Sequence, residues 1–182
     1  MHRIVAGITD LAQHIEALSR TPERYRPQRC PHCGISRVWG HGHYYRKADL
    51  EQRGEANANP VPIPRYCCAG CGQTCSRLPE CIAPRRWYNW LLQQISVRAV
   101  IDDRPPPVPP PVPPPGPLPA RRTVGRWWRS LQMRTPQFRF YLSSRYPELG
   151  RFVLDTDFWR AVFAGSGLSA AMTLLDQEIG VP

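Results

Sequence analysis

A chain of 182 residues with a net charge of +10 has room for one modest domain or a few small modules, none of which can build a large hydrophobic core alone. Its 23 arginines and one lysine outnumber 14 acidic residues, which favours a polyanionic partner such as nucleic acid. No apolar run approaches the roughly 20 residues of a membrane helix, so we expect no membrane partner. The N-terminus lacks the apolar stretch of a signal peptide, and we therefore expect a cytoplasmic protein, in which thiols stay reduced.

The first predicted element is a short amphipathic helix in residues 1–25. Asp10 belongs to a residue type that caps helix N-termini. Three apolar residues follow it at helical spacing, namely Leu11, Ile15 and Leu18. We expect the helix to end before Pro22 and to pack its apolar stripe on the module that follows.

Residues 26–84 are predicted to form a zinc ribbon, because they contain two Cys-x-x-Cys pairs. The four sulfur ligands are Cys30, Cys33, Cys68 and Cys71. Two residues between cysteines let both sulfurs reach one cation, and tetrahedral Zn²⁺ takes four such ligands. Gly34 and Gly72 follow the two pairs and allow the chain to fold back over the sulfurs. Since four thiolates leave no position for water or substrate, we predict a structural zinc ion; a disulfide framework or unpaired thiols are the alternatives.

Three further cysteines, Cys67, Cys75 and Cys81, are left outside this ligand set. Cys67 neighbours a ligand and could compete with it, but small buried residues are the favoured interpretation for all three. His41 and His43 are weaker candidates for metal ligands, because the four cysteines already complete a tetrahedral site.

A cationic and aromatic segment between the two Cys pairs is predicted to form a β hairpin. In an extended strand, side chains two residues apart share one face. Here that face carries Arg37, Trp39, His41, His43, Tyr45 and Lys47. Such a surface can follow a phosphate backbone with its rings against sugars or bases. One alternative is that Trp39 and Tyr45 pack on the N-terminal helix, and another is that Gly40 and Gly42 form bulges that break the alternation.

The strand that returns to the second Cys pair is predicted over residues 61–66. It contains Pro62 and Pro64, which lack the backbone N–H that a strand donates to its neighbours. These prolines predict that the strand lies at an edge of the sheet.

Residues 85–135 are predicted to form a helix-turn-helix-like region that a proline-rich linker, residues 104–120, interrupts. The first helix follows from apolar residues at intervals of three and four, namely Trp87, Trp90, Leu91 and Ile95. Residues 105–119 hold 11 prolines in 15 positions, which predicts a polyproline II spacer. A docking site for a proline-binding domain is the less favoured alternative.

A basic helix is predicted after the linker. Its buried side carries Val124, Trp127, Trp128 and Leu131. Three arginines fall away from that side, namely Arg122, Arg126 and Arg129. Residues 121–147 contain seven arginines and no acidic residue, and an uncompensated charge on a helix with an aromatic back is typical of a recognition helix. A solvated basic helix that packs through its tryptophans is the alternative.

Residues 136–182 are predicted to form a helical C-terminal module. Its most regular apolar stripe contains Phe158, Trp159, Val162 and Phe163. Such stripes are more typical of a core than of a cofactor site, although a second copy or another protein could also cover them. The fold class expected for the chain is therefore α+β, with a zinc ribbon flanked by helices and a mostly α C-terminal half.

Several strings resemble a bacterial family of small zinc-ribbon proteins of unassigned function. They are residues 22–27 before the first Cys pair, 77–79 and 82–88 after the second, and 121–123 before Trp127 and Trp128. That family is itself similar to the N-terminal zinc-ribbon and helix-turn-helix region of insertion-sequence transposases. The resemblance implies a transposase-like DNA-binding protein associated with a mobile element. In this chain the proline segment stands where the middle helix of the helix-turn-helix is expected.

The leading functional hypothesis is a zinc-stabilised protein that binds double-stranded DNA, as an accessory or remnant of transposition. A transposase or another protein is a further candidate partner, and the sequence leaves open whether the chain forms a homo-oligomer. We expect no enzymatic activity, because few residues follow Cys71 and the acids among them, such as Asp102, Asp103, Asp155 and Asp157, lie beside linkers or at helix starts. The alternatives are a protein-interaction adaptor that docks partners on the ribbon and polyproline segment, and a transcription regulator.

Overall fold

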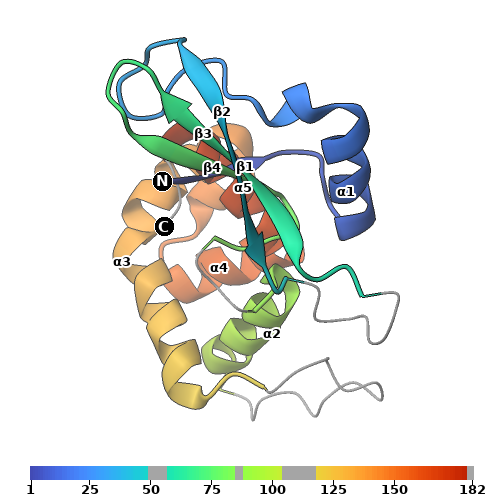
Figure 1. The fold of residues 1–182 in the computed structure, drawn as a ribbon. Helices are drawn as coiled ribbons and strands as arrows, with labels where there is room; N and C mark the ends of the chain where they lie inside the picture. Colours follow the sequence, from blue (N-terminus) through green and yellow to red (C-terminus); the bar gives the residue numbers. More distant parts are fainter. Residues whose placement is uncertain (49–56, 85–87, 104–117, 180–182) are drawn as a thin grey trace. The chain divides into compact units, whose positions relative to one another are not determined.

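The computed structural model describes residues 1–48, 57–84, 88–103 and 118–179 (Figure 1). The chain divides into two compact units, Met1–Trp87 and Tyr88–Ile179. The first contains a four-stranded mixed sheet and the second is built from helices, which confirms the predicted α+β class. Of the linker expected at residues 104–120, residues 104–117 lie outside the described residues.

The sheet of the first unit has the strand order β1-β4-β3-β2. Its strands are β1 (His2–Val5), β2 (Val38–Arg46), β3 (Val61–Cys68) and β4 (Thr74–Pro79). The strands β2, β3 and β4 pair antiparallel, whereas β1 pairs parallel to β4. The sequence analysis did not predict β1, which is only four residues long and takes its partner from the far end of the unit. Ile4 and Val5 of this strand are buried.

The prolines of β3 reveal why the edge prediction is wrong for the strand as a whole. β3 lies between β2 and β4, but its pairing with β4 begins only at Arg65. Pro62 and Pro64 pair with β2 but not with β4. On the side away from β2, no described strand requires the backbone N–H that proline lacks. There the carbonyl of Pro62 accepts a hydrogen bond of 2.8 Å from the imidazole Nε2 of His14. The prolines therefore mark a local edge within an internal strand.

Helix α1 (Leu11–Arg20) lies beside the sheet (Figure 1) and begins as predicted. The Asp10 carboxylate accepts a hydrogen bond of 2.8 Å from the backbone amide of Gln13, as expected of an N-cap. The buried side of the helix, however, carries His14 and Ala17, and Ile15 is exposed. The prediction from apolar spacing thus identified the helix but placed its buried face wrongly, because a histidine with buried partners fills the central position.

His14 links three elements of the first unit. Its Nε2–H donates to Pro62 of β3, and its Nδ1 accepts from the Tyr25 hydroxyl of the 3-10 helix η1 (Pro22–Tyr25). Both side chains are fully buried. Burial lowers the pKa of His14, which keeps the ring neutral and able to make one donor and one acceptor contact.

The second unit contains α2 (Trp90–Ile101), α3 (Arg121–Arg145), α4 (Asp155–Ala164) and α5 (Gly167–Ile179), with the 3-10 helix η3 (Pro147–Arg151) after α3. The boundary expected between residues 135 and 136 falls inside α3, which continues through Pro136. The reason is a single buried stripe on both sides of that proline. This stripe consists of Val124, Trp127, Thr135, Phe138 and Leu142.

Packing around Trp159 forms the centre of the helical unit. Trp159 of α4 is fully buried, stands edge-on to Phe138 of α3 with ring centroids 6.1 Å apart, and donates its indole N–H to the Thr135 hydroxyl at 3.0 Å. The apolar stripe of α4 is thus core, as the sequence analysis favoured. Among the described residues no single helix is both long and apolar enough to cross a membrane, and only α4 and α5 together, bent by 104°, pass that test.

Arg160 joins the ends of two helices in the same unit. Its guanidinium contacts the Asp102 carboxylate at 2.7 Å, the Asp157 carboxylate at 2.9 Å and the Ile101 carbonyl at 2.9 Å. The hydrogen bond that Arg160 donates to Asp102 is the main reason why the pKa of Arg160 is raised. Asp102 and Asp157 therefore have structural roles at the end of α2 and the start of α4.

We predict that His14→Leu destabilises the first unit, because the buried Tyr25 hydroxyl and the partly buried Pro62 carbonyl both lose their hydrogen-bond partner. The expected loss in the free energy of unfolding is about 1–3 kcal/mol, measured by chemical denaturation with circular dichroism. Since burial holds the folded-state pKa of His14 below the ordinary value of about 6.5 for histidine, the unfolded chain binds the proton more readily. The wild-type advantage over His14→Leu should therefore shrink as the pH falls below 6.5; a constant difference down to pH 5 would contradict this role.

Candidate metal centre

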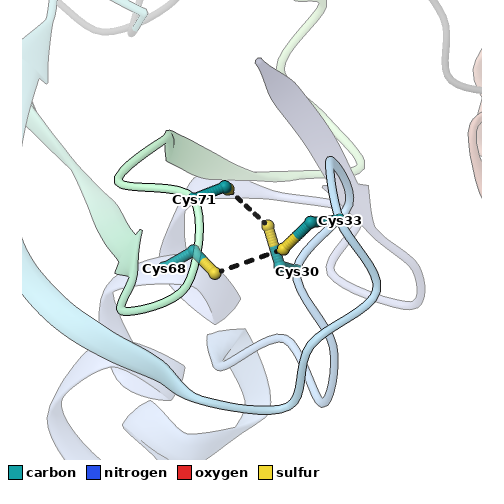
Figure 2. A group of neighbouring side chains, drawn as sticks. All are labelled: Cys30, Cys33, Cys68 and Cys71. Carbon is teal, nitrogen blue, oxygen red and sulfur yellow. Dashed lines mark hydrogen bonds between the residues drawn. The ribbon is translucent and has the colours of Figure 1, made fainter.

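The four cysteines of the two Cys-x-x-Cys pairs meet at one point in the first unit. Cys30 and Cys33 come from the loop before β2, Cys68 ends β3, and Cys71 lies in the turn between β3 and β4 (Figure 2). All four Sγ atoms lie within 4.8 Å of one another. The sequence analysis selected these four residues as ligands, and the fold brings them together from segments more than 30 residues apart.

The distances between the sulfurs fit a shared metal ion and do not fit disulfides. Sγ of Cys30 is 3.7 Å from Sγ of Cys71, and Sγ of Cys33 is 3.5 Å from Sγ of Cys68. Four sulfurs at about 2.3 Å from one tetrahedral ion would be ~3.8 Å apart, whereas a disulfide bond is about 2.05 Å long. None of the seven cysteines forms a disulfide. The cluster can therefore hold a metal ion.

The two loops that carry the cysteines have the same hydrogen-bond pattern. In the first, the amide of Cys30 donates to the carbonyl of Ile35 and the amide of Gly34 to the carbonyl of Cys30. In the second, the amide of Cys68 donates to the carbonyl of Gln73 and the amide of Gly72 to the carbonyl of Cys68. Gly34 and Gly72 have φ angles of +75° and +68°, which side chains rarely allow, so the glycines are needed for this turn.

Backbone amides also point at the sulfurs. The amide of Gly70 donates to Sγ of Cys68 at 3.3 Å, and the amide of His32 donates to Sγ of Cys30 at 3.4 Å. The amides of Cys71 and Gly70 lower the pKa of the Cys68 thiol to about 6, which favours its thiolate form. Thiolate is the form that binds metal ions.

The cysteine cluster joins the surface to the core of its unit. Cys30 and Cys68 are buried in an apolar cluster with Val38, Tyr66 and Cys75, whereas Cys33 and Cys71 are exposed. A bound ion would thus fix two surface loops against the same core. The carbonyl of Arg37 also accepts a hydrogen bond of 2.9 Å from the amide of Ala69, which ties the start of β2 to the second loop.

The remaining candidate ligands lie elsewhere. Among the described residues, the clustered ligand atoms include none from Cys67, Cys75 or Cys81, nor from His41 or His43. Cys75 belongs to the buried apolar cluster, and burial raises the pKa of Cys81 to about 12. These two thiols therefore stay protonated and pack as small apolar side chains.

The six β2-region residues proposed for nucleic-acid contact are all exposed but do not share one face. Pairing with β3 shifts by one residue between Gly40 and His43, where Gly42 has a φ of +70°. Such a bulge reverses the alternation of side chains. Before the bulge, Trp39 pairs with Cys67 of β3. After the bulge, His43 pairs with Pro64 and Tyr45 with Pro62, and these prolines lie on the opposite face of β3 from Cys67. Trp39 therefore lies on the opposite face from His43 and Tyr45, as the bulge alternative anticipated.

The arginines proposed on the basic helix do share one face of α3. Arg122, Arg126 and Arg129 are exposed and follow each other at intervals of four and three residues. At 100° per residue this face is opposite the buried stripe of α3. The same face continues through Met133 and Phe140, which are 78% and 69% exposed. The sequence analysis missed these two, although their spacing from Arg129 would have identified them.

We predict that the purified protein contains one metal ion per chain, and that Cys68→Ser loses this ion while Cys67→Ser keeps it. The two cysteines are neighbours and the substitutions are chemically identical, but only Cys68 belongs to the sulfur cluster. Elemental analysis of gel-filtered protein measures the metal. Ion binding contributes on the order of 10 kcal/mol to folding. Cys68→Ser and chelator treatment should therefore both unfold the first unit and abolish its β-sheet signal in circular dichroism. Metal-free protein with an intact sheet would refute this role.

Comparison with known proteins gives one match. No curated protein and no solved structure matches the chain. Residues 30–127 match a family described as a domain of unknown function, DUF6431. The matched segment includes all four clustered cysteines and the first residues of α3. Since it spans more than half of the chain, the protein belongs to the DUF6431 family.

Proposed function

We propose that this protein is a zinc-stabilised, double-stranded-DNA-binding protein related to transposition, which acts as an accessory factor or remnant without a catalytic domain. The observation that carries the proposal is the arginine face of α3. The sequence resembles a family of small zinc-ribbon proteins that is itself similar to the N-terminal region of insertion-sequence transposases, and this supports the connection to mobile elements. The cysteine cluster supports the bound metal ion, and the exposed residues of β2 support a second contact with DNA.

Zinc is the metal proposed for the cluster. Four thiolates in a tetrahedral arrangement are a typical donor set for structural zinc and leave no coordination position for a substrate. When bound, the ion would supply rigidity rather than Lewis acidity. Cys30 and Cys68 would anchor it to the core, while Cys33 and Cys71 would close the site from the surface.

The arginine face of α3 has the properties that contact with a phosphate backbone requires. Arg122, Arg126 and Arg129 form no ion pair within the described part of the chain, so their charges are available to a partner. The buried stripe on the other side holds the helix rigidly, with Trp127 and Phe138 in the core. In this proposal α3 takes the part of the recognition helix, and Arg126 and Arg129 reach phosphates or base edges.

The exposed residues around β2 offer a second, smaller cationic surface. Trp39 is 57% exposed and lies under the guanidinium of Arg26, whose central carbon is 5.8 Å from the centre of the indole ring. Tyr45 is 64% exposed on the other face. Because of the bulge, a nucleic-acid strand would meet the two aromatic side chains separately and would contact the edge of β2 rather than a flat face.

A protein-interaction adaptor is the second candidate, and one observation favours it. Met133 and Phe140 continue the arginine face of α3 as large apolar side chains that are mostly exposed. A face with arginine, methionine and aromatic residues is also typical of protein–protein interfaces. In that case the arginines would pair with acidic residues of a partner, and DNA would compete poorly.

We predict that labelled duplex DNA binds the protein with an affinity that falls steeply with salt, measured by fluorescence anisotropy. In the double variant Arg126→Ala/Arg129→Ala, binding should weaken and the slope of log K against log salt should become shallower by about 2, because two phosphate contacts are lost. Arg20→Ala is the matched control: it removes the same kind of charge from an exposed pair with Glu16 on α1 and should leave the slope unchanged.

Flat, negligible binding at low salt would exclude the DNA proposal and favour the adaptor. A double variant Met133→Ala/Phe140→Ala also distinguishes the DNA-binding proposal from the adaptor. It should leave the salt slope for DNA intact if the arginines contact phosphate, since neither side chain is charged.

A further inference from the structure

Four arginines line a depression of about 540 Å³ beside the first Cys-x-x-Cys pair, in the first unit. They are Arg3, Arg26, Arg29 and Arg77, and the other lining residues are Pro27, Gln28, Cys30 and Pro31. None of the eight described lining residues is acidic. The volume lies within the roughly 300–1,000 Å³ of typical small-molecule sites. Below, this depression is called the arginine pocket.

Two of the arginines are placed opposite each other by the sheet. Arg3 of β1 and Arg77 of β4 are register partners on neighbouring parallel strands. Their side chains therefore start from adjacent points of the sheet, and an anion bound between them can accept hydrogen bonds from both guanidinium groups.

The other two arginines, Arg26 and Arg29, come from the segment between η1 and Cys30. Backbone carbonyls accept hydrogen bonds from two of the four arginines and so orient their side chains. The Arg77 guanidinium donates to the Tyr25 carbonyl at 3.1 Å. Arg26 donates through Nε and Nη2 to the Val38 carbonyl at 3.3 and 3.0 Å. These contacts orient the guanidinium groups of Arg26 and Arg77. The Glu23 carboxylate approaches Arg26 only to 3.8 Å, in an exposed pair.

We propose that the arginine pocket binds a phosphate group. Guanidinium groups match the oxygens of carboxylate and phosphate, but four of them around one depression suit a phosphate, which carries more charge and more acceptor oxygens. The volume exceeds what the phosphate alone needs, so the pocket takes a phosphate ester with part of its sugar. Gln28 supplies an amide that can hydrogen-bond to that sugar.

The phosphate can come from a free nucleotide or from a nucleic-acid backbone. Arg26 belongs to the pocket and also lies over the ring of Trp39, so the pocket adjoins the exposed start of β2. A nucleic-acid strand that contacts β2 could therefore place one phosphate in the pocket. The site is distinct from the arginine face of α3, and it does not depend on whether that face binds DNA.

Isothermal titration of the full, metal-loaded chain with inorganic phosphate and with adenosine 5′-monophosphate tests the site, with adenosine as the uncharged control. We expect one saturable site for both phosphates and none for adenosine. Arg29→Ala should weaken binding about tenfold, Arg29→Lys should restore it only in part, and Arg20→Ala should leave it within about twofold. Arg29 is exposed and makes no hydrogen bond or ion pair in the described part of the chain, so its removal should not unfold the protein.

Duplex and single-stranded oligonucleotides form the second arm of the experiment. If the free phosphates do not bind but Arg29→Ala weakens oligonucleotide binding about tenfold while Arg20→Ala does not, the pocket serves a nucleic-acid backbone and the proposal stands. If Arg29→Ala changes neither, the proposal is overturned. Loss of DNA binding in the α3 variants alone bears only on the proposed function, because those variants leave the pocket intact.

Discussion

The meeting of four sulfur atoms from two loops is the constraint on which the first unit depends. The sheet of this unit is small, and one of its edges is a four-residue strand. Its apolar residues fall into two modest clusters rather than one large core, and small domains of this kind usually need a covalent or metal link to be stable. Cys30 and Cys68 belong to one of those clusters, so a metal ion bound by them would join the loops and the core in one unit. Both the exposed start of β2 and the arginine pocket are attached directly to these loops.

Local chemistry made much of this predictable. The two Cys-x-x-Cys-Gly strings determine both the ligands and the turn, because the positive φ of Gly34 and Gly72 follows from the need to bring amides to the sulfurs. Asp10 likewise indicates the start of α1, because an N-cap side chain bonds to a backbone amide only three positions away. For these two features the determinant and its effect are close in the chain, so the sequence was sufficient.

Features that depend on distant partners escaped prediction. β1 is a strand because β4, more than 70 residues away, offers it a parallel edge. The sequence analysis did not select His14, and only the fold shows that Tyr25 and the Pro62 carbonyl satisfy both of its ring nitrogens. The arginine pocket is assembled from three segments whose residues carry no common motif. In α3 the apolar stripe outweighs Pro136, which local propensity alone would have made a boundary.

The bulge in β2 also bears on how the molecule behaves in concentrated solution. β2 forms one border of the sheet, and an uninterrupted border strand exposes a row of amides and carbonyls to which a neighbouring molecule can add its own strand. The extra residue between Gly40 and His43 interrupts that row and twists it. Cationic side chains at Arg37 and Lys47 flank it on both sides, so two such borders would repel each other. Self-association into fibrils through this strand is therefore disfavoured, while a polyanion meets no such barrier.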